Sequence, residues 1–412
     1  MISYLVVYQI LVLKILVISD VGNYFKTVSK YVKNSKMHII NFPKDGAGVY
    51  TYDENYELFE NYKVEDQVQK INEIKNNFDL AVVMGSGERI AYLADLNYIS
   101  YYVGRDIDAP RFIKNSREKW FDEPLHKLNF LERKFYKKTF DFAIAHIAPT
   151  WVFEHLKKFQ GNNIKMDLKP IDLTLFNEDV DELKIEKEKF TFFCPQRMGI
   201  PKGTDILWKS LKYCKSDFQI LQVDWRDTGT DEEDRKSLQI RENLPDQVKL
   251  IPMIKRKEIP KYYKWCDAVI GNLKIGSFEY VELEAVMLKK PVINFKDKKI
   301  KIICDEKEIE SPFVPEENDP EKIAKIIDEF VLSSKFRKDI FDKQYEFVQK
   351  ISDPQRAGKW WDELFENLSK EYSSINRSSG KTNIKLRMIG FLISNRLYLN
   401  KIRKIIYGKH DR

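Results

Sequence analysis

The chain alternates short apolar runs with segments in which apolar residues recur at helical spacing. That alternation is typical of parallel β-sheets flanked by helices, because a strand buried on both faces reads as a continuous apolar run. A helical segment, such as the one predicted at 65–76, separates several of these runs. Before residue 150, strands are predicted at 14–19, 37–42, 79–85, 98–104 and 141–146.

A highly charged segment at 176–190 interrupts the pattern, and its composition predicts a surface connector. The alternation then restarts, with strands predicted at 190–195, 218–223, 247–253, 267–272 and 291–295. This restart predicts a second α/β domain of similar size. Because such sheets bind ligands at the carboxyl ends of their strands, we expect a site between the two domains.

The last part of the chain has a different pattern. Residues 322–372 are helical in spacing, 373–383 read as a polar linker, and the remainder mixes apolar and basic residues. The sequence therefore predicts five parts: an apolar extension at 1–13, an N-terminal α/β domain at 14–180, a second α/β domain at 181–350, a helix at 351–372 that can cross back to the first domain, and a linker with a basic tail at 373–412.

Both ends of the chain are apolar enough that a membrane contact has to be considered. The N-terminus is apolar through Ile18 apart from Lys14, but it lacks a basic start and a small-residue cleavage site, so no signal peptide is predicted. Its uninterrupted part is shorter than the ~20 residues of a membrane span, although an anchor remains the alternative. The tail at 384–409 favours an interfacial helix on an anionic membrane surface. Its alternative is packing on the protein itself or on a dimer partner.

Composition narrows the function classes. The chain has 412 residues, too many for one ordinary domain, and its net charge is +7 from 70 basic and 63 acidic residues. No dense basic and aromatic patch accompanies that small excess, so nucleic-acid binding is not predicted. The 4 cysteines form no CxxC pair and the 5 histidines no ligand cluster, which predicts free thiols in a reducing cytoplasm and no metal site.

The loop "PQRMGIPKG" follows the predicted strand at 190–195 and carries Arg197 and Lys202. It lies between a strand and a helix, on the side where α/β proteins bind ligands. Gly199 and Gly203 allow close backbone approach, and an arginine with a lysine can neutralise a diphosphate. The alternative is an ordinary solvated loop.

A second segment, "NLKIGSFEYVELEAVMLKKPVINF" at 272–295, predicts a strand, a Gly–Ser loop, a helix and another strand. Glu284 lies mid-helix between Leu283 and Ala285, where a buried carboxylate without a partner would be unfavourable. Hydrogen bonds from ribose hydroxyls would explain it there. An exposed helix carboxylate is the alternative.

Together these segments resemble the retaining glycosyltransferases of the GT-B fold, the large group called glycosyltransferase family 4. "QRMGIPKG" resembles the family pattern GRLxxxKG, and "GSFEYVELEAVMLKKPVI" resembles GFGxxxLEAMAxGxPVI. "KPIDLTLFNED" resembles the xGVDxxxF segment that closes the N-terminal domain, and "IPKYYKWCDAVI" resembles the segment before the glutamate motif. The order and spacing of these motifs make the resemblance specific over 169–295, with thinner coverage before it.

The resemblance implies a fold and a set of site residues. The fold is α/β, with two doubly wound Rossmann-like domains facing a cleft and C-terminal helices. Arg197 and Lys202 would bind the donor diphosphate and stabilise the leaving nucleotide without a metal or cofactor. The donor-binding residues implied are Glu284, which would bind the ribose, with Gly276, Ser277, Phe278, Glu279 and Gly22.

Asp106 is the third catalytic candidate. It lies in "YYVGRDIDAPRF", which resembles the family's HGSDI segment, and would make a polar contact near the reacting sugar. The alternative is a structural helix cap. The sequence departs from the family pattern in several places. Gly276 stands in place of the first of the paired glutamates, and Val103 in place of the histidine. The usual glycine pair is missing from 221–227, and only one glycine, Gly22, follows the first strand. Glu279 is the nearest carboxylate that could substitute for the missing glutamate.

The resemblance therefore implies a retaining hexosyltransferase that moves a sugar from a nucleoside-diphosphate sugar to a glycan or lipid-linked acceptor. We expect it in the cytoplasm, with its tail on the inner face of the cell membrane. Two alternatives stay open. One is an inverting transferase with a general base such as Asp106. The other is a glycosyltransferase-like protein that binds a nucleotide or glycan, or scaffolds partners, without catalysis.

Overall fold

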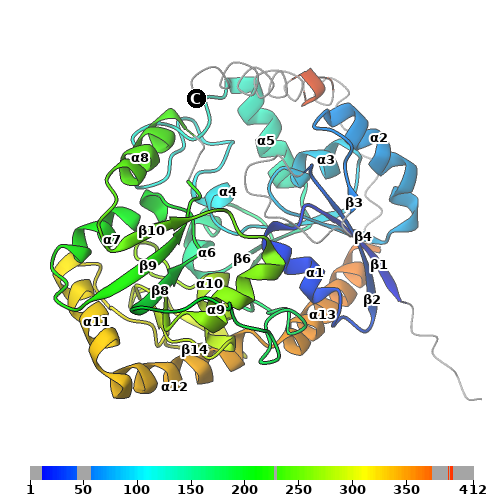
Figure 1. Cartoon of the computed structure of the whole chain (residues 1–412). Helices are drawn as coiled ribbons and strands as arrows, with labels where there is room; N and C mark the ends of the chain where they lie inside the picture. Colours follow the sequence, from blue (N-terminus) through cyan, green and yellow to red (C-terminus); the bar gives the residue numbers. More distant parts are fainter. Residues whose placement is uncertain (1–11, 44–56, 227–229, 374–387, 389, 393–412) are drawn as a thin grey trace, which may run out of the picture.

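A computed structural model describes residues 12–43, 57–226, 230–373, 388 and 390–392. Within these residues the chain forms a 7-stranded sheet with strand order β3-β2-β1-β4-β5-β6-β7 and a 5-stranded sheet with order β10-β9-β8-β11-β12. In each sheet the order reverses at the first strand of the domain, which is the doubly wound arrangement. Figure 1 shows the two domains beside each other, with helices packed around both sheets. The predicted α/β class with two Rossmann-like domains is confirmed.

The first sheet is parallel throughout, and its strands at 80–83, 98–101 and 145–148 are fully buried. Its strands are β1 (Leu13–Ile18), β2 (Ser35–Asn41), β3 (Glu57–Leu58), β4 (Leu80–Val83), β5 (Tyr98–Tyr101), β6 (Ala145–Ala148) and β7 (Asn163–Lys165). Its helices are α1 (Tyr24–Val28), α2 (Val64–Ile74), α3 (Gly87–Leu93), α4 (Arg105–Asp108), α5 (Phe130–Phe142) and α6 (Thr150–Leu156).

The strand predicted at 141–146 is wrong at its start. Asp141 and Phe142 end helix α5, and the strand begins at Ala145. Helix α5 continues that far because Phe135 and Phe140 keep its buried face apolar, while a capping box at Asn129 fixes its first turn. The residues predicted as one strand therefore belong to two elements, the end of α5 and the start of β6.

The strands predicted from residue 190 on form the second sheet. Its strands are β8 (Phe190–Cys194), β9 (Phe218–Val223), β10 (Val248–Ile251), β11 (Ala268–Ile270) and β12 (Val292–Ile293), with a separate hairpin of β13 (Ile302–Cys304) and β14 (Lys307–Ile309). Its helices are α7 (Thr204–Leu211), α8 (Asp231–Glu242), α9 (Ile259–Trp265), α10 (Tyr280–Met287), α11 (Pro320–Leu332) and α12 (Ser334–Ile351). The helical segment predicted at 322–372 consists of α11, α12 and α13 (Pro354–Ser373).

Helix α13 leaves the second domain and packs on the first, beside α1 (Figure 1). The Trp361 side chain is 0% exposed, and its Nε1 donates a hydrogen bond of 2.9 Å to the Tyr24 hydroxyl. Asp362 accepts hydrogen bonds from the backbone amides of Lys33 and Asn34 and from the Ser35 hydroxyl. The C-terminal helix thus ties the end of the second domain to the N-terminal sheet.

None of the helices in the described part of the chain is long and apolar enough to cross a membrane. Most of the apolar extension at 1–13 lies outside the described residues, and so does the basic tail at 384–409 apart from residues 388 and 390–392. Their predicted roles therefore stay predictions. The four cysteines, all in described segments, are free thiols.

Candidate functional site

A cavity of about 830 Å³ lies between the domains at the carboxyl ends of β1, β4 and β5. Most of its lining comes from the first domain, while Arg197, Glu279 and Tyr280 come from the second. The cavity lies where the strand order predicts a ligand.

The loop after β8 brings Arg197 to this cavity, with its guanidinium 5.2 Å from the centre of the Trp225 ring. The loop then forms a 3₁₀ turn at Ile200–Lys202 and reaches Gly203, whose φ is 75°. A Cβ at that position would lie 2.9 Å from the backbone of Leu273, so the turn requires glycine. Glycine at this position thereby lets the loop approach the segment that follows β11.

Lys202 does not line the cavity but pairs with Glu279, which does. The Lys202 Nζ lies 2.6 Å from Glu279 Oε1, and the lysine side chain is only 13% exposed. Burial favours the neutral acid, but the charge and hydrogen bond of Lys202, with Lys169 nearby, outweigh it and lower the pKa of Glu279 to about 2. Glu279 is therefore ionised at neutral pH, and any anion that approaches Lys202 competes with it.

The loop before α10 explains why the first glutamate of the family pattern is missing. Gly276 has a φ of 82°, and a Cβ there would lie 2.5 Å from the Cβ of Asp297. This backbone excludes a glutamate at position 276. Asn294 donates to the carbonyl of Ser277, and Lys169 of the first domain donates to the carbonyl of Phe278 at 2.5 Å. Both domains therefore hold the loop.

Glu284 is 2% exposed in α10 and does not line the cavity. It forms an ion pair with Arg256, whose Nη1 lies 2.9 Å from Glu284 Oε2. Burial raises the pKa of Glu284, and the Arg256 charge opposes that rise. The buried carboxylate thus has an internal partner. Sequence reasoning missed Arg256 because its basic loop has no distinguishing pattern, and the role of Glu284 as a ribose ligand stays a prediction.

Asp106 lies in α4 and lines the cavity. Its Oδ1 accepts a 3.1 Å hydrogen bond from the Gly104 amide, and burial raises its pKa to about 6. It therefore makes a local backbone contact and also faces the cavity. Gly22, with a φ of 71°, lines the same cavity, and a Cβ there would meet the Tyr280 ring at 3.6 Å.

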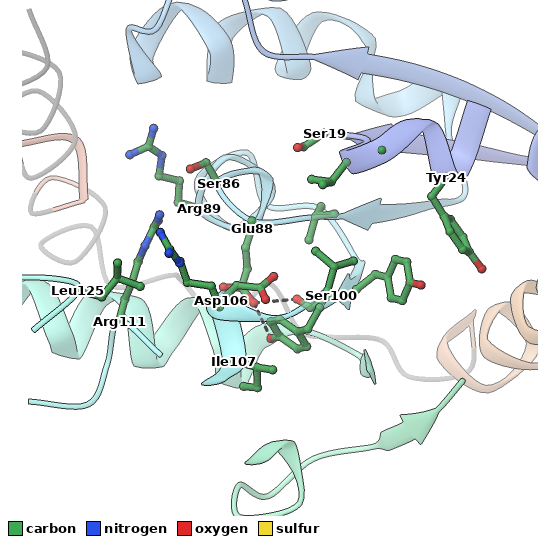
Figure 2. A pocket seen from close by; sticks show the side chains of 18 of the residues that line it. Ser19, Tyr24, Ser86, Glu88, Arg89, Ser100, Asp106, Ile107, Arg111 and Leu125 are labelled. Carbon is green, nitrogen blue, oxygen red and sulfur yellow. Dashed lines mark hydrogen bonds between the residues drawn. The ribbon is translucent and has the colours of Figure 1, made fainter. Parts of the chain in front are cut away.

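The first domain contributes polar residues to the cavity that the sequence did not reveal: Glu88, Arg89, Arg111 and His126. Glu88 Oε1 accepts hydrogen bonds of 2.7 Å from Ser100 and 2.9 Å from Tyr102 (Figure 2), and burial raises the Glu88 pKa. Burial, with the charges of Arg111 and Arg105, lowers the pKa of His126 to about 3. Glu88 and Arg89 are neighbours in α3, whereas Arg111 and His126 lie between α4 and α5, so no single motif marks all four.

Arg105 links the two domains across the cleft. It pairs with Glu118 of its own domain at 2.9 Å and with Glu233 of helix α8. The backbone amides of Asp122 and Glu123 donate to Glu232 at 2.9 and 2.8 Å. These contacts hold α8 against the first domain at the edge of the cavity. In the described ranges, no group of three His, Cys, Asp or Glu side chains could hold a metal ion.

Residues 176–347 match the family model of glycosyl transferases group 1. Over these residues the second α/β domain is similar to group 1 glycosyltransferases. That domain supplies Arg197, Lys202 and the 276–284 segment, whereas Asp106 and Gly22 lie outside the match. The predicted resemblance to this group of glycosyltransferases is thus confirmed over the second domain. No curated protein sequence matches the chain.

Solved structures confirm the GT-B fold over 86% of the chain. HepE from Anabaena, in complex with UDP and glucose, is 16% identical with a TM-score of 0.59, over 86% of this chain and 100% of that one. Sucrose-phosphate synthase from Thermosynechococcus elongatus is 14% identical with a TM-score of 0.63, over 86% and 99%. A glycosyltransferase from Rickettsia africae is 16% identical with a TM-score of 0.53, over 87% and 98%. At these identities the likeness is one of fold.

Proposed function

We propose that the protein transfers a sugar from a nucleoside-diphosphate sugar, bound by its group 1 domain, to an acceptor bound by its first domain. The observation that carries this proposal is the Arg197–Lys202 loop at the end of β8, beside the cavity between the domains. When the bond between sugar and phosphate breaks, negative charge grows on the leaving diphosphate. Two fixed cations stabilise that charge without a metal.

Retention of configuration and a glycan or lipid-linked acceptor belong to this proposal. Retention is supported by the motif resemblance over 169–295. The lipid-linked acceptor is supported by the mixture of apolar and basic residues at 384–409. HepE was solved with UDP, so uridine nucleotides are the first donors to test.

The test is thermal unfolding of the full chain with UDP, GDP, ADP and the corresponding glucose conjugates. A ligand at about 100 times its Kd stabilises by roughly 2.7 kcal/mol, and we expect such a shift for one of these nucleotides. Arg197→Ala and Lys202→Ala should each remove it. Lys209→Ala, which removes an exposed charge on α7, should keep it. A wild type that responds to no nucleotide, or variants that respond equally, would refute the proposal.

Nucleotide binding without catalysis is the second candidate. Gly276 favours it, because the backbone there has no room for the first glutamate of the family pattern. A transfer assay with labelled donor separates the two functions. The anomeric form of the product then separates a retaining enzyme from an inverting one that uses Asp106 as base.

Glu279→Gln is expected to tighten binding of the nucleoside diphosphate by up to about tenfold. The Lys202 ammonium is held by Glu279, and the diphosphate has to replace that carboxylate. The neutral amide leaves Lys202 available while keeping the shape of the side chain. Isothermal titration of wild type and variant measures the change. Weaker binding by the variant would instead mean that Glu279 contacts the donor directly.

A further inference from the structure

Two arginines of the first domain end close together on one wall of the cavity (Figure 2). Arg89 comes from α3 and Arg111 from the segment that follows α4. Among the described residues, neither has a carboxylate within ion-pair distance, and the buried Nε of Arg89 has no hydrogen-bond partner. The guanidinium of Arg111 lies 5.1 Å from the centre of the Tyr136 ring.

The charge of the neighbouring Arg105 is neutralised, because Glu118 and Glu233 both form ion pairs with it. Arg89 and Arg111 have no such ion pair, and Arg111 acts on the Glu88 and Asp106 carboxyls only from beyond ion-pair distance. Burial lowers the pKa of Arg89, the Tyr136 hydroxyl opposes that change, and the Arg111 charge adds to it. Both arginines are half-buried, and two neighbouring cations in a partly desolvated pocket are unfavourable unless an anion joins them. Such uncompensated charge in a cleft is typical of a functional site.

The acidic residues nearest this wall do not fill that role. Glu88 is engaged by Ser100 and Tyr102, and its burial favours the neutral acid. Asp106 accepts from the backbone of its own turn. The Arg89–Arg111 wall also belongs to the first domain, whereas Arg197 and Lys202 belong to the second. A donor diphosphate bound at Arg197 and Lys202 therefore leaves Arg89 and Arg111 for another ligand.

We propose that Arg89 and Arg111 bind an anionic group of the acceptor, a phosphate or a carboxylate attached to the sugar or lipid that is glycosylated. Each planar guanidinium can donate two parallel hydrogen bonds to such an oxyanion. The proposal rests on the proposed function only in naming the ligand as the acceptor. The anion site itself depends on the two arginines and the cavity.

The test is isothermal titration of the full chain, with UDP present at saturation so that the donor site is filled. The probes are glucose 6-phosphate, glucuronate and dihexanoyl phosphatidic acid, with glucose as the neutral reference. At least one anionic probe should bind at least tenfold more tightly than glucose. Comparison of the sugar phosphate with the short-chain lipid shows whether the phosphate comes from a soluble or a lipid acceptor.

Arg89→Gln and Arg111→Gln should each lower the affinity for the anionic probe by about tenfold or more. Lys134→Gln, which removes an exposed charge from α5, should bind like the wild type. Thermal unfolding checks that each variant folds. If a glutamine variant does not fold, the corresponding lysine variant, Arg89→Lys or Arg111→Lys, is used instead. It keeps the charge but cannot donate two parallel hydrogen bonds, so its affinity for the probe should also fall. Glutamine variants that bind like the wild type, or a wild type that binds no anionic probe, would overturn the site.

Arg197→Ala separates this proposal from the proposed function. It should remove UDP binding and keep binding of the anionic probe, whereas Arg89→Gln should do the reverse. If no nucleotide binds the wild type but probe binding still requires Arg89, the transferase proposal fails and the anion site stands. If UDP binding requires Arg197 and probe binding ignores Arg89, the anion site fails alone.

Discussion

Arg256→Ala is expected to lower the free energy of unfolding by about 3–5 kcal/mol. The variant leaves the Glu284 carboxylate, 2% exposed in helix α10, without its ion-pair partner. Removing one member of a buried pair is strongly destabilising because the other charge stays desolvated. Urea denaturation of wild type and variant at neutral pH measures the difference.

The pH dependence of that loss identifies its cause. Burial already raises the pKa of Glu284 in the folded state, and removal of Arg256 raises it further. A carboxyl with a raised folded pKa destabilises the fold above that pKa, and the penalty vanishes as pH falls to the unfolded value of about 4.3. The deficit of Arg256→Ala should therefore shrink between pH 8 and pH 5. A deficit that is the same at both pH values would contradict the charge argument.

A double variant provides the matched control. Arg256→Met with Glu284→Leu replaces the pair by apolar side chains and should recover most of the lost stability. Once folded, it also tests the predicted ribose contact, because it lacks the Glu284 carboxylate. Nucleotide affinity should then fall although stability is restored. Unchanged affinity would remove Glu284 from the donor site.

Trp361→Ala is expected to lower the free energy of unfolding by about 3–5 kcal/mol, as for other large-to-small changes in a core. The Trp361 ring is fully buried and contacts the rings of Tyr24, Phe25 and Tyr101 at centroid distances of 6.2, 5.0 and 5.9 Å. It is the largest fully buried side chain of α13. Urea denaturation measures the loss of stability, and limited proteolysis detects a C-terminal helix released from the first domain.

Trp361→Phe separates packing from hydrogen bonding at this position. The variant keeps an aromatic ring among the same neighbours but removes the Nε1 donor to the Tyr24 hydroxyl. Its expected loss is clearly smaller than that of the alanine variant. Lys359→Ala, two residues away with a side chain 79% exposed, should be neutral. A small effect of Trp361→Ala would mean that α13 is held mainly by the polar contacts of Asp362.

The sequence by itself determined the two α/β domains. Strands such as β1 and β8 are buried on both faces, and their apolar runs are local signals that do not depend on neighbours. The short strands β3 and β7 were not predicted, since the letters "EL" and "NIK" contain no such run. Those strands form because they pair with the edges of a sheet that already exists.

The same division holds for the site. The sequence placed Arg197 and Lys202 in a strand-to-helix loop, because β8, the loop and α7 are contiguous in the chain. Only the tertiary structure paired Lys202 with Glu279 and Arg256 with Glu284. It also brought Arg89 and Arg111 to one wall of a cavity that both domains line. Those contacts depend on the strand order and on how the two domains pack together. Contacts between charged residues of distant segments produce no periodic pattern in the sequence.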